Sequence, residues 1–169
     1  MTDAEFLQLI GDNKGILFKI SNSYCRNRDD REDLIQEIIY QLWKSARNFD
    51  STRKFSTWVY RIALNVAISY YRKQRRSGLR IAFGADLHLM ELADGREDPE
   101  TDEKVDILQQ FISQLNELDK ALMILYLEEK TYREIAEILG ITETNVATKL
   151  SRIKGRLKQQ FFKITNEFL

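Results

Sequence analysis

Apolar side chains recur at helical spacing in this 169-residue chain, and this pattern constrains the fold most strongly. The longest stripe predicts a helix from about Asp30, capped by Asp29 and Asp30. Its expected core positions are Leu34, Ile35, Ile38, Ile39, Leu42, Trp43 and Ala46. A second stripe predicts a helix over about 56–76. A helical hairpin is expected between 4 and 25, with Phe6, Leu9, Ile10, Ile16, Leu17 and Ile20 buried. One Pro and seven Gly are too few for a turn-rich all-β domain, so the sequence predicts an all-α fold.

Residues 77–104 interrupt this helical pattern. The segment gathers glycines, the one proline and many acidic residues, so it is interpreted as a flexible acidic linker. It separates two small helical domains, residues 1–76 and 105–169. In the second domain, apolar spacing predicts one helix over 105–115 and another over 118–127, capped by Asn116.

The charges are unevenly distributed although they sum to zero. Residues 44–76 carry nine basic groups and one acidic group, a net charge of +8, whereas 77–130 have −8 and 131–169 have +3. Phosphates respond to charge within a Debye length of about 8–10 Å, so a neutral total does not exclude nucleic acid as a partner. Solvated helix faces also produce such runs, so charge alone leaves the function open.

The chain carries no sign of export or membrane insertion. Its first residues lack a basic region and an apolar region, and its longest uncharged runs are ten residues, against about 20 for a membrane span. The lone Cys25 allows no internal disulfide and fits a reducing compartment. We therefore expect a soluble protein in the cytoplasm.

The most specific stretch begins at Thr131. Thr131 and Glu134 have the spacing of a capping box, and the helix that they open is expected to end at Gly140. Thr142 then caps a further helix, and Val146 locks it against the first, which is the helix-turn-helix pattern. The second helix would present Glu143, Thr144, Asn145, Thr148, Lys149 and Arg152 to DNA, and Lys154, Arg156 and Lys158 to phosphates. A plain αα-hairpin is the alternative.

Together these features resemble an extracytoplasmic-function RNA polymerase sigma factor. The resemblance rests on 33–37, Trp43, 55–65, the acidic linker and 132–156, and covers nearly all of 5–162. It implies a two-domain protein that binds core RNA polymerase through its first domain and directs it to promoter DNA. It also implies a transcription initiation factor without catalytic group or cofactor. Many such proteins are held inactive by an anti-sigma protein, so one is a candidate partner.

The resemblance assigns roles to three sets of residues. Core polymerase would bind a polar, acidic face of the first domain: Asp33, Gln36, Glu37 and Gln41. The loop 48–55 and the following helix would melt and hold the minus-10 element through Asn48, Lys54, Trp58, Arg61, Asn65, Arg72, Lys73, Arg75 and Arg76. The minus-35 element would be read by Thr144, Asn145, Thr148, Lys149, Arg152 and Lys154. Ala147 stands where many family members carry a basic residue, so no base preference is carried over.

Each assignment has a structural alternative. Stacking on an aromatic ring stabilises an unpaired base by about 1–3 kcal/mol, which suits Trp58 to a melted strand. Trp58 could equally be a half-buried core aromatic. The face at Asp33 and Glu37 could be an ordinary solvated surface.

Other functions find less support in the sequence. His88 is the only histidine and lies in the linker, and no P-loop, Gly-x-Ser-x-Gly or Cys-x-x-Cys motif occurs. A metal at Asp33 and Glu37 would lack further ligands. A self-sufficient helix-turn-helix regulator, with residues 1–76 as a dimerisation or sensor domain, remains the alternative. A purely structural interaction module is the third reading.

Overall fold

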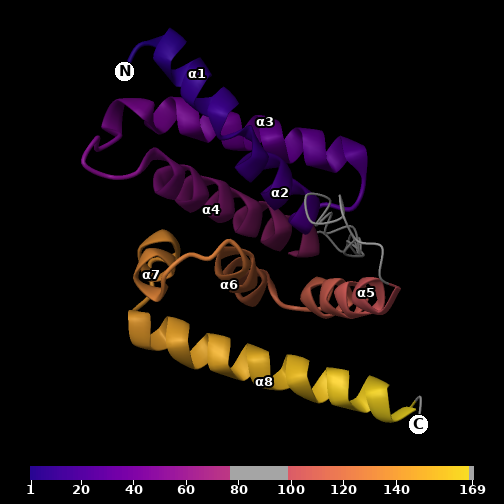
Figure 1. The fold of residues 1–169 in the computed structure, drawn as a ribbon. Coiled ribbons are helices and arrows are strands. Elements are labelled where there is room, and N and C mark those ends of the chain that lie inside the picture. Colours follow the sequence, from indigo (N-terminus) through magenta and orange to yellow (C-terminus); the bar gives the residue numbers. More distant parts are fainter. Residues whose placement is uncertain (77–98, 168–169) are drawn as a thin grey trace. The chain divides into compact units, whose positions relative to one another are not determined.

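The computed structural model describes residues 1–76 and 99–167, with 99–102 as backbone alone, and divides the chain into two compact units at residues 88 and 89 (Figure 1). Within these ranges the chain forms helices and no strand, which confirms the all-α fold. His88 and residues 77–98 of the expected linker lie outside the described residues.

The first unit contains α1 (Asp3–Asp12), α2 (Lys14–Tyr24), α3 (Arg28–Ser45), the short 3-10 helix η1 (Ala46–Asn48) and α4 (Phe55–Arg76). α3 and α4 run side by side, and α2 contacts both (Figure 1). The predicted hairpin is confirmed, with its break at Asn13. Of the six residues expected to be buried, Phe6, Ile10, Leu17 and Ile20 are buried, while Leu9 and Ile16 are only partly buried.

The buried face of α3 is narrower than the sequence predicts. Leu34, Ile38 and Leu42 are fully buried, whereas Ile39 is 36% exposed and Trp43 is 56% exposed. Ile39 and Trp43 each follow a buried residue by one position, and one step turns a side chain by about 100° around the helix. The prediction that Trp43 is a core residue is therefore wrong.

Asn27, rather than Asp29 or Asp30, caps α3. Its side-chain oxygen accepts a hydrogen bond from the Asp30 amide at 2.8 Å, and α3 begins at Arg28. Asp29 and Asp30 lie in the first turn, where the helix dipole favours acidic groups. Asp30 also accepts a 3.4 Å hydrogen bond from the Tyr70 hydroxyl, which links the start of α3 to α4.

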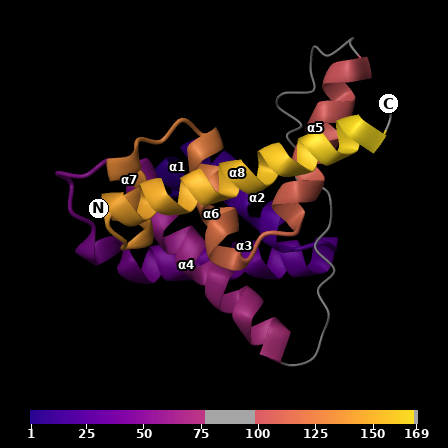
Figure 2. The same ribbon diagram turned by 90° about the horizontal axis from the view of Figure 1, so that it is seen from below.

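The second unit contains α5 (Pro99–Ser113), α6 (Glu117–Leu127), α7 (Tyr132–Leu139) and α8 (Glu143–Glu167). α6 crosses α8, and α7 lies against the N-terminal half of α8 (Figure 2). The core draws on all four helices: Ile112, Leu122, Leu125, Ile135, Ile138, Val146, Leu150 and Ile153. α5 begins at Pro99, inside the expected linker, because proline suits the first position of a helix.

The helix α7 begins and ends as predicted. The Glu134 amide donates to Thr131 Oγ1 at 3.1 Å, and the Thr131 amide donates to Glu134 Oε2 at 2.8 Å, which completes the capping box. Gly140 takes a left-handed conformation, with φ of 68°. The amides of Gly140 and Ile141 both donate to the Ala136 carbonyl, so the last turn is closed.

The following turn and helix complete the helix-turn-helix. The Asn145 amide donates to Thr142 Oγ1 at 3.1 Å, as expected for the cap of α8. Val146 is fully buried and Ala136 is 9% exposed, and α7 packs against α8. The predicted helix-turn-helix is confirmed.

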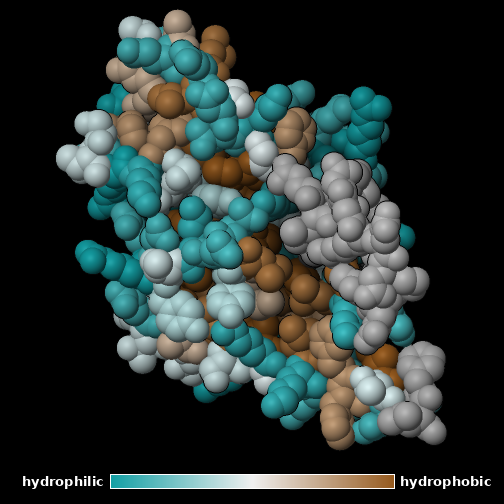
Figure 3. Space-filling model, viewed as in Figure 1, coloured by the Kyte–Doolittle hydropathy of each residue, from teal (hydrophilic) through white to brown (hydrophobic). Residues whose placement is uncertain are grey.

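The surface is mixed, with apolar side chains visible near α1 and near the C-terminal half of α8 (Figure 3). Leu7 on α1 is 67% exposed and Phe162 on α8 is 68% exposed. Among the described helices, none has the length and hydropathy to cross a lipid bilayer.

Candidate nucleic-acid and protein interfaces

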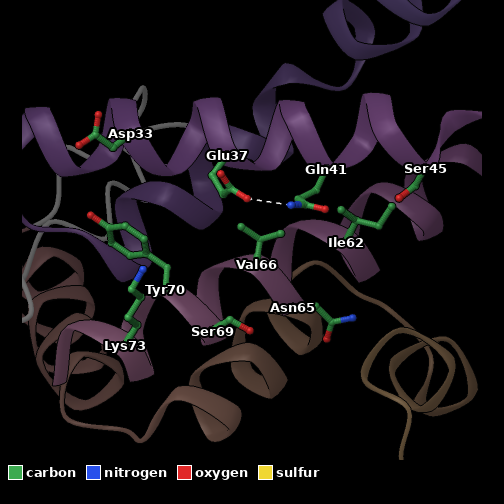
Figure 4. Close-up of a pocket in the computed structure, with 10 residues that line it drawn as sticks. All are labelled: Asp33, Glu37, Gln41, Ser45, Ile62, Asn65, Val66, Ser69, Tyr70 and Lys73. Atoms are coloured by element: carbon green, nitrogen blue, oxygen red, sulfur yellow. Dashed lines mark hydrogen bonds between the residues drawn. The ribbon is translucent and has the colours of Figure 1, made fainter. Parts of the chain in front are cut away.

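A groove of about 700 Å³ runs between α3 and α4, here called the α3–α4 groove (Figure 4). Its walls are Asp33, Glu37, Gln41 and Ser45 from α3, and Ile62, Asn65, Val66, Ser69, Tyr70 and Lys73 from α4. Three residues expected to bind polymerase thus share one groove with Asn65 and Lys73, which were assigned to the minus-10 element. The fourth, Gln36, is exposed but does not line this groove.

One hydrogen bond orders the acidic wall of the α3–α4 groove. The Gln41 side-chain amide donates to Glu37 Oε1 at 2.8 Å, one turn along α3 (Figure 4). Asp33 lies one turn before Glu37, so the two carboxylates belong to the same wall of the groove. Such a wall can receive basic or amide groups from a partner.

Tyr70 closes the groove beside Asp33. Burial, followed by the negative charge of Asp30, raises the pKa of the Tyr70 hydroxyl to about 12. Tyr70 therefore remains neutral at physiological pH and donates its hydrogen bond to Asp30.

A second groove, of about 440 Å³, lies where the loop after η1 meets the start of α4, and is here called the loop groove. Its walls are Ser45, Asn48, Phe49, Asp50, Arg53, Trp58, Arg61, Ile62 and Asn65. The structure thus brings together Asn48, Trp58, Arg61 and Asn65 from the predicted minus-10 set. Its volume lies within the roughly 300–1,000 Å³ range of sites that hold small ligands. Lys54 is exposed and is not part of its wall.

Three aromatic rings, from Phe49, Phe55 and Trp58, pack against one another beside the loop groove. The ring centroids of Phe49 and Trp58 are 5.1 Å apart, those of Phe55 and Trp58 are 5.2 Å apart, and Phe49 and Phe55 are 5.4 Å apart. Tilted and edge-to-face rings at such distances attract one another. Sequence reasoning singled out Trp58 but missed Phe49 and Phe55, although the i, i+3 spacing of Phe55 and Trp58 indicates a contact.

The loop itself is fixed by Asp50. Its carboxylate accepts hydrogen bonds from the Thr52 amide at 3.0 Å and the Thr52 hydroxyl at 2.7 Å. These hydrogen bonds lower the pKa of Asp50, and the bond from the Thr52 amide has the largest effect. The guanidinium of Arg53 lies 3.9 Å from the same carboxylate. The loop groove therefore has one fixed negative charge among basic and amide groups.

The C-terminal half of α4 is strongly basic. Its exposed cations are Arg72, Lys73, Arg75 and Arg76. Positive side chains near a helix C-terminus are stabilised by its dipole, so they are compatible with α4 without needing an acidic partner. They form a cationic surface in the same unit as both grooves.

In the second unit, the start of α8 is open to solvent. Thr144, Asn145, Thr148 and Arg152 are exposed, while Lys149 is partly buried. These side chains share one side of the helix, because Val146, Leu150 and Ile153 turn the opposite side into the core. Five of the six residues predicted to read the minus-35 element thus lie on one face.

Lys154, the sixth, occupies a different environment. Its ammonium lies 4.1 Å from the ring centroid of Tyr126, the cation–π arrangement. Hydrogen bonding to the Tyr126 side chain raises the pKa of Lys154, and Tyr132 contributes in the same direction. Neither tyrosine was expected to contact α8.

Arg156 also contacts a neighbouring helix. Its guanidinium lies 3.2 Å from Asp119 Oδ2, and the Asp119 side chain is 12% exposed. Asp119 in turn accepts a hydrogen bond from the Asn116 side chain at 3.1 Å. Sequence reasoning expected Arg156 at a phosphate and gave no local signal for this pair.

A metal site finds no support in the described part of the chain, where no three His, Cys, Asp or Glu side chains gather to hold an ion. Asp33 and Glu37 share the α3–α4 groove without a third such residue.

Comparison with protein families identifies both units. Residues 9–77 match Sigma-70 region 2, and residues 106–157 match Sigma-70, region 4. The first match covers α2 to α4 and both grooves, and the second covers the helix-turn-helix.

Relatives align with this chain over nearly its whole length. The Bacillus subtilis RNA polymerase sigma factor SigV is 30% identical over 96% of this chain and 94% of its own length. The Bacillus subtilis ECF RNA polymerase sigma factor SigW is 30% identical over 92% and 88%. Among solved structures, the Bartonella quintana sigma factor RpoE in complex with the anti-sigma factor NepR covers 94% of each chain, with a TM-score of 0.68 and 22% identity. This last likeness concerns the fold.

Proposed function

Since the chain belongs to the extracytoplasmic-function family of RNA polymerase sigma factors, we propose that its two units divide promoter recognition between them. The protein is a transcription initiation factor that associates with core RNA polymerase and directs it to promoters. The two sigma-70 regions, in order along one chain, exclude the self-sufficient regulator considered above. Residues 1–76 dock on polymerase and hold the minus-10 element, the segment between α4 and α5 connects the units, and the second unit, from α5 onward, reads the minus-35 element.

The polymerase-docking surface is the acidic side of α3, comprising Asp33, Gln36, Glu37 and Gln41. Asp33, Glu37 and Gln41 form one wall of the α3–α4 groove, and Gln36 is exposed. An aligned row of carboxylates and amides favours a partner helix with basic residues, and charge complementarity fixes its register.

The loop groove carries the minus-10 assignment. Asn48, Trp58, Arg61 and Asn65 surround a space of ligand size at the start of α4, and the cationic end of the same helix lies about two to three turns beyond Asn65. A base that leaves the duplex can stack on Trp58, while Lys54, Arg72, Lys73, Arg75 and Arg76 hold the strand. Melting then draws on binding energy, and no nucleotide hydrolysis or cofactor is required.

The exposed face of α8 carries the minus-35 assignment. Asn145, Thr148 and Arg152 lie within the first turns of the second helix of a helix-turn-helix, which enters the major groove. Asn and Arg side chains can form paired hydrogen bonds with adenine and guanine.

Acting on chromosomal promoters places the protein in the cytoplasm.

An anti-sigma protein is a further proposed partner. The relative RpoE was solved with the anti-sigma factor NepR, and CnrH with the cytosolic domain of CnrY. A regulator that covers the α3–α4 groove would block polymerase docking without altering the fold.

Co-elution with core RNA polymerase on a sizing column tests the docking surface. Glu37→Lys reverses the charge at the centre of the acidic wall, and Asp12→Lys makes the same change on the exposed end of α1. The wild type and Asp12→Lys should co-elute with polymerase, whereas Glu37→Lys should bind at least about tenfold more weakly. Co-elution of Glu37→Lys at the wild-type level would place docking elsewhere on the protein.

A further inference from the structure

The rotation of α8 about its own axis decides which side chains reach DNA. Each residue turns the helix by about 100°, so a small rotation moves Asn145 away from a base edge and Lys149 away from the DNA backbone. The buried side of α8, which includes Val146, Leu150 and Ile153, consists of aliphatic side chains. The hydrophobic effect is non-directional, so directional polar contacts beside this packed face add a further restraint on the rotation.

Two polar contacts hold α8 on opposite flanks of this core face. Lys154 and Arg156 are two positions apart, so their side chains project about 160° from each other around the helix. Lys154 lies on the Tyr126 ring at 4.1 Å, and Arg156 pairs with Asp119 at 3.2 Å.

Both contacts connect to the same crossing helix. Asp119 lies in the first turn of α6 and Tyr126 in its last turn, while α6 crosses α8 (Figure 2). The two ends of α6 therefore hold the two flanks of α8. Tyr132, at the start of α7, also raises the pKa of Lys154, in the same direction as Tyr126.

We propose that Lys154 and Arg156 are positioning residues that fix the rotation of α8, and that Lys154 does not contact a DNA phosphate. This inference rests on the proposed role of α8 as the minus-35 reader. It replaces the sequence-based assignment of Lys154 to DNA. The ammonium has an aromatic and hydroxyl environment within its own unit, which compensates its charge without a phosphate.

Salt dependence distinguishes the two roles of Lys154. A lysine on a phosphate releases counterions, and its removal lowers the slope of log K against log salt concentration by about 0.9. A positioning lysine weakens binding without changing that slope. Holoenzyme, formed with core polymerase, is titrated with a promoter duplex that wild-type holoenzyme has selected from a random-sequence pool.

The comparison uses Lys154→Met and Lys149→Met. Both remove one charge from α8, but Lys149 belongs to the exposed reading face. Lys154→Met should weaken binding about threefold to tenfold at an unchanged slope. Lys149→Met should lower the slope by about 0.9. An equal fall of the slope for Lys154→Met would make it a phosphate contact and overturn the inference.

A double-mutant cycle tests the Tyr126 contact directly. Tyr126→Leu should weaken DNA binding as Lys154→Met does, and the double variant should lose no more than either single variant. Tyr126→Phe and Lys154→Arg retain a ring and a cation, so both should bind as the wild type does. Additive losses in the double variant would exclude the contact as the cause.

The outcomes also separate this inference from the proposed function. If Lys149→Met and Lys154→Met both bind as the wild type does, α8 is not the minus-35 reader. The positioning role of Lys154 is then excluded as well. If Lys149→Met alone weakens binding, α8 reads DNA but Lys154 does not position it. Circular dichroism of each variant should match the wild type, which ties a loss of binding to the altered contact.

Discussion

The rings of Phe49 and Trp58 lie 5.1 Å apart between centroids, on the side of the loop groove where the loop meets α4. Trp58 thus combines two roles considered above, that of a half-buried core aromatic and that of a stacking surface for a base. The side chain is partly buried against Phe49 and Phe55, and it also lines the groove. An aromatic ring whose orientation is already fixed can receive a base with little loss of side-chain entropy.

Trp58→Ala should therefore impair promoter melting. Loss of one stacking surface is worth about 1–3 kcal/mol, which corresponds to roughly fivefold to 150-fold in the population of open complex. Permanganate reactivity of thymines in the minus-10 element measures this population. Phe18→Ala, which removes a 51% exposed ring from α2, is the control and should melt DNA normally. Normal melting by Trp58→Ala would contradict the stacking role.

Phe49→Ala should destabilise the first unit and act on melting through Trp58. Removing a partly buried ring that contacts two others should lower the free energy of unfolding by about 1–2 kcal/mol. Urea denaturation followed by circular dichroism measures the change. A loss below about 0.5 kcal/mol would mean that the aromatic cluster contributes little to the loop.

Tyr70 should make stability depend on alkaline pH. Its pKa is raised from 10.0 to about 12 in the folded protein, so the unfolded chain ionises first. The stability that Tyr70 contributes is complete below pH 10 and is lost as pH rises toward 12. Tyr70→Phe removes this titration and the hydrogen bond to Asp30. The difference in unfolding free energy between wild type and variant should shrink over this range; a constant difference would contradict the shift.

Gly140 and Gly155 should respond oppositely to alanine. Neither has a heavy atom within 4 Å of an added Cβ, so backbone conformation alone decides the effect. At Gly140, with φ of 68°, alanine should cost about 1 kcal/mol in unfolding free energy. At Gly155, inside α8, it should stabilise by roughly 0.5–1 kcal/mol. Thermal denaturation of the two variants tests this, and the same sign for both would refute it.

Glu129 is in a conformation that favours glycine. It is the one non-glycine residue with positive φ, 57°, among those described, and it follows the last turn of α6. Glu129→Gly should raise the unfolding free energy by about 1 kcal/mol. Glu128→Gly, at φ of −81°, is the control and should not be stabilising. A Glu129→Gly variant no more stable than the wild type would show that the carboxylate has a compensating contact.

Local signals predicted most of the fold. Three local features are confirmed: the capping box at Thr131, the left-handed Gly140 and the cap at Thr142. Each of them depends only on residues within about four positions along the chain. Periodicity was less informative for the width of a buried face. Trp43 follows the helical pattern of α3, but its exposure depends on where α2 and α4 pack, which no local signal specifies.

The candidate site was predictable in its residues more than in their arrangement. Asn48, Trp58, Arg61 and Asn65 were expected together and line one groove. The pairs of Lys154 with Tyr126 and Arg156 with Asp119 join residues far apart in the sequence. A charged side chain on a helix looks the same in sequence whether its partner is a phosphate or a neighbouring helix, so these contacts needed the tertiary structure.

Run-off transcription tests the central claim most directly. Purified protein and core RNA polymerase are combined with the promoter duplexes that the holoenzyme selects, and transcripts are mapped at their 5′ ends. The sigma factor function predicts discrete transcripts that require both components and begin a fixed distance downstream of the selected minus-10 and minus-35 elements. Specific duplex binding by the protein alone, with no protein-dependent transcript from competent polymerase, would contradict it.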